Sequence, residues 1–190
     1  MEFVLGSSLK SVVRADAPLE PARAIDFALQ ILEATRFSHS QGITHGDLKS
    51  ANVIVDARGT AKVADFGIAS TGARGMTPAG SILGTVEYMS PERLMGEPGT
   101  EACDVYSIGI ILYELLTGRL PFDHELVPTV ALKHLGGAPV PPADLNPAIT
   151  PGLSAIILRH GRRPRRIATR PPPRSWQFCV ARRLAQGRLS

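Results

Sequence analysis

The sequence reads HGDLKSAN over residues 45–52 and DFG over residues 65–67, and these two stretches hold the polar residues with the clearest chemical pattern. Asp47 can accept a proton from a hydroxyl, and Lys49 can neutralise charge on a phosphoryl group in transit. The Asn that closes the first stretch and the carboxylate of the second offer the oxygen ligands that magnesium prefers. Residues of these types in this order indicate phosphoryl transfer assisted by a metal ion.

The segments next to the two motifs have readable patterns. Apolar residues at 53–55 and 61–64 flank the sequence Asp-Ala-Arg-Gly at 56–59, which predicts two short strands joined by a tight turn. The motifs then lie at the ends of a β-hairpin. Upstream, apolar residues recur at helical spacing between Pro21 and Gly42, so we expect an amphipathic helix there.

The downstream segments predict a mostly helical chain. Residues 68–100 are rich in Gly, Ser, Thr and Pro, as is typical of a long surface loop. Residues 103–117 are apolar almost all round, which predicts a central, buried helix with Cys103 as a small buried hydrophobe. A proline-rich connector at 139–151 leads to another apolar helix that starts at 152–158. The expected fold class is mainly α with a small β-hairpin.

Three further stretches extend the pattern over most of the chain. They read MEFV at residues 1–4, GTVEYMSPE at 84–92 and DVYSIG at 104–109. Together with the first two motifs, they resemble the C-terminal, substrate-side lobe of eukaryotic-type protein serine/threonine kinases, and within them the bacterial branch. The resemblance implies a partial kinase domain over residues 1–158 that starts at the hinge between the lobes, with the N-terminal lobe absent.

The resemblance implies a role for each motif residue. Asp47 is the expected catalytic base, Lys49 assists the transfer and contacts ATP, and Thr85 bridges the two. Asn52 and Asp65 are expected to hold magnesium and the bound ATP. The implied reaction is transfer of the ATP γ-phosphate to Ser or Thr hydroxyls of a protein substrate.

Other positions are assigned by the same resemblance. Backbone groups of Glu2 and Val4 are expected to bind adenine at the hinge, with Met1 as gatekeeper, although four such residues could also form a frayed strand. Asp104 is expected to anchor the backbone of the catalytic loop, while an Asp just before an apolar helix could equally be an N-cap. His45 is expected to orient the loop by packing and hydrogen bonding. Surface or packing roles are expected for the other histidines, at positions 39, 124, 134 and 160.

The sequence departs from the family pattern in several places. Gly46 stands where an arginine usually precedes the catalytic Asp, so we do not expect the usual ordering of the loop by phosphorylation. Ser90 stands where the family has Ala. No glycine-rich loop, strand lysine or helix glutamate precedes the predicted hinge in these 190 residues. We therefore expect this chain by itself to be catalytically inactive.

Charge divides the chain into two parts. Residues 1–158 hold 11 Lys and Arg against 17 Asp and Glu, whereas residues 159–190 hold ten Arg and no acid. The net charges are −6 and +10. Because the family pattern stops where the arginines begin, we interpret residues 159–190 as a frameshifted or disordered tail. A basic arm for nucleic acid is the less favoured alternative.

Composition fits a globular protein, with 44% hydrophobic and 20% charged residues. No apolar run approaches the roughly 18 residues needed to span a bilayer, and the first residues do not resemble a signal peptide. We therefore expect a cytoplasmic protein. The rival to an enzyme is a non-catalytic kinase remnant that binds a protein partner or competes with an intact kinase.

Overall fold

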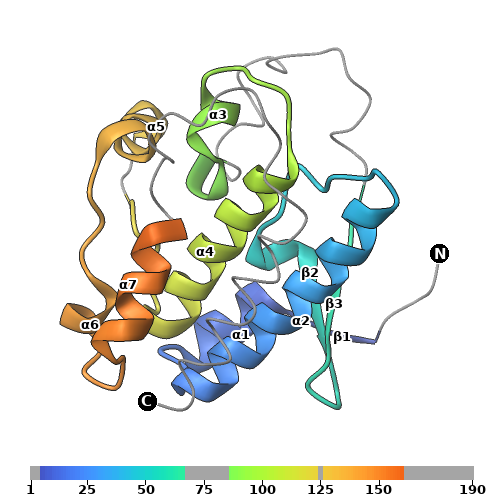
Figure 1. Ribbon diagram of the computed structural model, residues 1–190. Helices are drawn as coiled ribbons and strands as arrows, with labels where there is room; N and C mark the ends of the chain where they lie inside the picture. Colours follow the sequence, from blue (N-terminus) through green and yellow to red (C-terminus); the bar gives the residue numbers. More distant parts are fainter. Residues whose placement is uncertain (1–4, 67–85, 124–125, 161–190) are drawn as a thin grey trace.

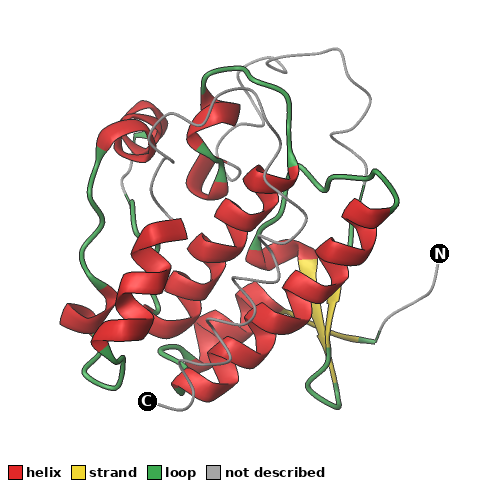
Figure 2. Cartoon of the chain, viewed as in Figure 1, coloured by secondary structure: helices red, strands yellow, loops and turns green. Residues whose placement is uncertain are grey.

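The structure is mostly helical with one small sheet, as the sequence predicts. The computed structural model describes residues 5–66, 86–123 and 126–160. Helices make up most of this part of the chain, and the strands lie together on one side (Figures 1 and 2). None of the described helices is long and apolar enough to cross a membrane.

The sheet has three antiparallel strands in the order β1-β2-β3. Strands β2 (Val53–Asp56) and β3 (Ala61–Val63) form the predicted hairpin. Strand β1 (Gly6–Ser8) adds a third strand that the sequence analysis did not predict. A Cβ on Gly6 would lie 2.3 Å from the Val55 carbonyl oxygen, so β1 can approach β2 this closely only with glycine at that position.

Two helices precede the loop at residues 45–52, which carries the first motif and which we call the catalytic loop after its expected role. Helix α1 (Leu9–Asp16) is capped by the Ser8 side chain, and helix α2 (Pro21–Ser40) begins with a proline in its first turn. Gly42 follows α2 with a φ of 75°, a conformation that glycine adopts at no steric cost. The predicted helix between Pro21 and Gly42 is therefore confirmed.

Helix α4 (Glu101–Thr117) runs through the middle of the described structure (Figure 1). Every residue from Cys103 to Leu116 is buried, which confirms the predicted central helix and the buried thiol. The helix is capped by Thr100 and ends at Gly118, whose φ is 71°. Asp104 therefore lies inside the helix and is not its N-cap.

The last part of segment 68–100, which was predicted to be a surface loop, contains regular structure, so this prediction was wrong there. The described part of this segment contains a 3₁₀ turn, η3 (Val86–Tyr88), and a short helix, α3 (Pro91–Leu94). Val86 and Tyr88 are each only 4% exposed. This part is packed into the protein because η3 lies against α4 and α5.

Three further helices lie on the far side of α4 from the sheet (Figure 1). They are α5 (Val127–Gly136), α6 (Pro142–Leu145) and α7 (Pro151–His160). The predicted connector at 139–151 thus contains a short helix, and α7 confirms the helix expected from residue 152. One hydrophobic core joins α1, α2, the hairpin, α4 and α7, and a smaller cluster joins η3 to α5.

Candidate active site

A buried carboxylate on α4 holds the loop that carries the first motif. Asp104 is 1% exposed, and its Oδ2 and Oδ1 accept hydrogen bonds from the backbone N–H groups of His45 (2.9 Å) and Gly46 (2.8 Å). These bonds confirm that Asp104 anchors the catalytic loop. Gly46 has a φ of 75°, so the residue that departs from the family pattern takes a backbone conformation suited to glycine.

His39 joins this anchor, and the sequence analysis gave it no such role. Its Nε2 lies 2.7 Å from Asp104 Oδ2, and the residue is 6% exposed. The signal available in the sequence is the spacing: His39 continues the buried stripe of α2 through Ala28, Leu32 and Thr35. It is therefore a packing residue, as expected, and also a hydrogen-bonding one.

His45 has the orienting role that was expected. Its Nε2 lies 2.9 Å from the Ala64 carbonyl oxygen, and its Nδ1 accepts a 3.3 Å hydrogen bond from the Asp47 backbone N–H. The ring also packs against Phe66, with the centroids 4.9 Å apart. The imidazole thus connects the catalytic loop to the residues that follow β3.

The structure brings together the side chains predicted from the first motif. Lys49 Nζ lies 2.7 Å from Asp47 Oδ2, and Asn52 Nδ2 donates to the Asp47 carbonyl oxygen at 3.0 Å. The Asp47 and Lys49 side chains are 33% and 22% exposed, so both can be reached from solvent. A carboxylate and a cation therefore lie side by side on one short loop. The 3₁₀ turn η1 (Ser50–Asn52) connects this loop to β2.

Asp65 lies two residues beyond β3 and is exposed, with the unusual φ of 61° for a residue other than glycine. The Ala64 backbone N–H donates to the Asn52 carbonyl oxygen at 2.8 Å, which ties this segment to the end of the catalytic loop. A positive φ of this kind often marks a functional position.

The side-chain oxygens of Asn52 and Asp65 suit a magnesium ion that also binds other ligands. The amide nitrogen of Asn52 is used as a donor to Asp47, so its amide oxygen is the atom that can bind a cation. That oxygen and the Asp65 carboxylate are hard ligands suited to magnesium, which commonly takes one or two protein ligands with phosphate and water. No cluster of three or more His, Cys, Asp or Glu side chains suited to a metal occurs within the described ranges.

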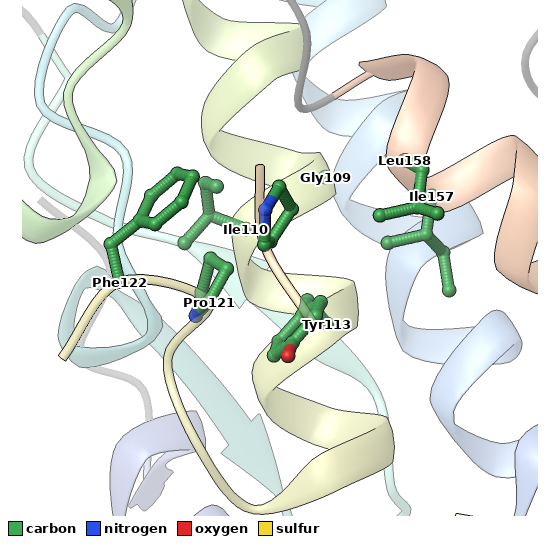
Figure 3. Close-up of a pocket in the computed structure, with 8 residues that line it drawn as sticks. Gly109, Ile110, Tyr113, Pro121, Phe122, Ile157 and Leu158 are labelled. Carbon is green, nitrogen blue, oxygen red and sulfur yellow. The ribbon is translucent and has the colours of Figure 1, made fainter. Parts of the chain in front are cut away.

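Three predicted site residues, Glu2, Val4 and Thr85, lie outside the described residues. So does most of the predicted tail, although α7 includes its first two residues. The small pocket drawn in Figure 3 is lined by apolar residues of α4 and α7 and by Pro121, Phe122 and Pro139. None of the catalytic-loop residues lines it, so it is not the place where this chemistry occurs.

A mainly helical fold, with a carboxylate, a lysine and an amide gathered on one loop that a buried Asp anchors, agrees with the arrangement expected from the resemblance to protein kinases. The sequence pattern of the protein kinase domain matches residues 1–136. The chain therefore belongs to the protein kinase family.

The relatives are bacterial serine/threonine kinases. The chain is 40% identical over 163 residues to the serine/threonine-protein kinase PknB of Mycolicibacterium smegmatis. It is 41% identical over 160 residues to the serine/threonine-protein kinase PrkC of Bacillus subtilis. Each match covers 84% of this chain but only 26% and 25% of those proteins, so the chain spans about a quarter of their length.

Proposed function

We propose that residues 1–158 are the C-terminal lobe of a serine/threonine-protein kinase that transfers the ATP γ-phosphate to protein Ser or Thr hydroxyls. The observation that carries this proposal is the catalytic loop, in which Asp47, Lys49 and Asn52 are held together over the buried anchor Asp104. The similarity to PknB and PrkC supports it.

In the proposed reaction, Asp47 accepts the proton of the attacking hydroxyl while it orients that hydroxyl toward the phosphorus. Lys49, which is paired with Asp47, would neutralise charge on the transferred group. Asn52 and Asp65 would hold magnesium. ATP supplies the phosphoryl group when bound, and the metal neutralises its charge.

The remaining roles rest on the family pattern alone. We propose that Thr85 bridges Asp47 and Lys49, and that the backbone of Glu2 and Val4 binds adenine. We also propose that residues 159–190 lie outside the kinase domain and that the protein acts in the cytoplasm, where ATP is available.

The test restores the elements that these 190 residues do not contain. A chimera carries the segment that precedes the hinge in M. smegmatis PknB, joined ahead of Met1. We expect it to phosphorylate a Ser/Thr substrate protein in the presence of ATP and magnesium. Asp47→Asn and Asp65→Ala should each lower the rate at least about 100-fold, whereas Asp16→Asn, which changes an exposed carboxylate on α1, should not.

The outcome separates the candidate functions. A folded chimera with no transfer would contradict the kinase proposal and favour a non-catalytic remnant that binds a protein partner, such as an intact kinase. The 190-residue chain alone is expected to transfer no phosphate, and transfer that Asp65→Ala abolishes would refute this. Salt-sensitive DNA binding that depends on residues 159–190 would favour the nucleic-acid alternative.

A further inference from the structure

A second buried carboxylate on α4 lies away from the catalytic groups and has its own cation. Glu114 is 1% exposed, in the middle of the hydrophobic core. Its Oε1 lies 2.5 Å from Nζ of Lys10 on α1, whose side chain is 29% exposed. A buried carboxylate without a partner is strongly destabilising, and this lysine is the cation that pairs with Glu114.

The Glu114 carboxylate also fixes the direction of a hydrogen-bond chain. The Tyr88 hydroxyl donates its single proton to Glu114 Oε2 at 2.8 Å. Burial, reinforced by the Glu114 charge, raises the Tyr88 pKa well above its usual range, so the phenol keeps this proton. The Ser50 hydroxyl, 3.0 Å from the Tyr88 oxygen, must therefore be the donor in their contact.

The chain of hydrogen bonds ends inside the catalytic loop. Ser50 is completely buried, directly follows Lys49 and is the first residue of η1, which ends at Asn52. The backbone of Tyr88 is held in turn, because Ser107 Oγ donates to its carbonyl oxygen at 2.9 Å. Helix α1, which carries Lys10, packs directly against η1, so the ion pair and the loop belong to one packed unit.

We propose that Lys10 is a positioning residue for phosphoryl transfer, which acts through Glu114, Tyr88 and Ser50 to hold the end of the catalytic loop. The proposal rests on the proposed kinase function for its meaning, since it concerns the placement of Lys49 and Asn52. The catalytic loop then has two anchors on α4. Asp104 holds the beginning of the loop, and Glu114, which is paired with Lys10, holds its end.

The test uses backbone amides at the two ends of the loop in the 190-residue chain. The Asn52 N–H donates to the Lys49 carbonyl oxygen at 3.0 Å and reports on the end of the loop. The N–H groups of His45 and Gly46 are bound to Asp104 and report on its beginning. Hydrogen exchange followed by NMR measures all three amides without any need for catalysis.

Two variants break the chain of bonds at different points. Lys10→Met removes the cation, and Tyr88→Phe removes only a hydroxyl and keeps the buried volume. We expect Asn52 to exchange about 5- to 10-fold faster in each, the effect of one lost hydrogen bond, while His45 and Gly46 keep their exchange rates. Lys10→Arg, which keeps the charge, should restore slow exchange at Asn52.

Matched controls make the same chemical changes elsewhere. Arg23→Met removes a cation from an exposed ion pair with Asp16, and Tyr113→Phe removes an α4 hydroxyl that donates to the Val140 carbonyl oxygen. Neither should change exchange at Asn52. Unchanged exchange in Tyr88→Phe, or equal acceleration of all three loop amides, would overturn the proposal.

The same variants in the chimera link the loop to the reaction. Lys10→Met is expected to lower kcat about tenfold while the KM for ATP stays constant, since a misplaced loop acts on the transfer step. If the chimera proves inactive, the kinase proposal fails, but the exchange result still decides whether Lys10 positions the loop. If the chimera is active and Lys10→Met leaves kcat unchanged, Lys10 has no part in transfer.

Discussion

Asp104 is the residue on which the placement of the catalytic loop depends most directly. Both of its oxygens accept backbone N–H groups, and His39 lies within hydrogen-bond distance of one of them. In Asp104→Asn, an NH₂ group would face a donor in at least one of these contacts. We expect the free energy of unfolding to fall by roughly 2 to 4 kcal/mol, because a buried donor is left without an acceptor.

Urea denaturation followed by circular dichroism measures this loss. The matched control is Asp16→Asn, which removes the same charge from an exposed ion pair with Arg23. Such a pair contributes little, so the control should stay within about 0.5 kcal/mol of the parent. Equal effects of the two substitutions would show that Asp104 does not have the anchoring role described above.

His134 makes stability depend on pH. It is 5% exposed, its Nδ1 lies 2.6 Å from the Tyr106 hydroxyl oxygen, and burial lowers its pKa to about 4. The unfolded chain binds this proton near the ordinary pKa of about 6.5. Between these values the unfolded state holds more protons, so stability falls as the pH drops from 6.5 to 4, by up to about 3 kcal/mol.

The substitution His134→Gln tests this dependence. Glutamine keeps an acceptor for the Tyr106 hydroxyl but does not titrate. We expect the urea midpoint of the variant to change less than that of the parent between pH 6.5 and pH 4, and to be equal to or below the parent's at pH 7. Parallel pH profiles in the two proteins would contradict the assignment to His134.

For single residues, the sequence predicts contacts between side chains that are close along the chain and misses contacts between side chains that are far apart along it. Asp47, Lys49 and Asn52 meet within six residues of chain, so their spacing alone predicts that they converge. Lys10 and Glu114 are 104 residues apart, and no local pattern indicates that they pair. The expected anchor role of Asp104 came from the family resemblance, since its own position also fitted an N-cap.

The elements that the sequence predicts are those with strong periodicity or a clear turn. Helices α2 and α4 and the β2–β3 hairpin match the expected ranges closely. Strand β1 was missed because Gly-Ser-Ser has no strand propensity, and it forms only through pairing with β2. The short helix α3 was missed because its four residues follow a stretch that reads as loop.

The end of α4 is set by Gly118. Its φ of 71° is a left-handed conformation that disfavours a Cβ, although an added Cβ would meet nothing closer than 3.6 Å. Gly118→Ala should therefore destabilise the protein by about 1 to 2 kcal/mol through backbone strain, not through a clash. Urea denaturation measures the change.

Gly136 is the control for this substitution. It is the last residue of α5, and an added Cβ would meet no atom within 4 Å. Gly136→Ala should be neutral or stabilise the protein by up to about 1 kcal/mol, because alanine is the better helix former. A loss of stability at Gly136 as large as that at Gly118 would mean that the left-handed cap is not the cause.

In the part of the chain that the structure describes, stability depends mainly on the larger of the two hydrophobic clusters, which surrounds α4. This helix contacts α2 on one side and α6 and α7 on the other, and the same hydrophobic cluster reaches Leu9 and Ile157. Both anchors of the catalytic loop, Asp104 and Glu114, project from α4. Because one element supports the core and the loop together, damage to the core should reach the site.

Ile111 is the position at which this dependence can be tested. It is completely buried in the cluster, so Ile111→Ala leaves a cavity and should lower the free energy of unfolding by about 2 to 5 kcal/mol and the Tm by about 5 to 15 °C. Leu132→Ala on α5, where the side chain is 68% exposed, is the control and should change stability by less than about 0.5 kcal/mol.

Far-ultraviolet circular dichroism follows the helices and the near-ultraviolet tyrosine signal follows the packing around α4. The two transitions should shift together, because one core unfolds as a unit. If only the tyrosine signal moved, the helices would not share a single core, and α4 could not couple it to the catalytic loop.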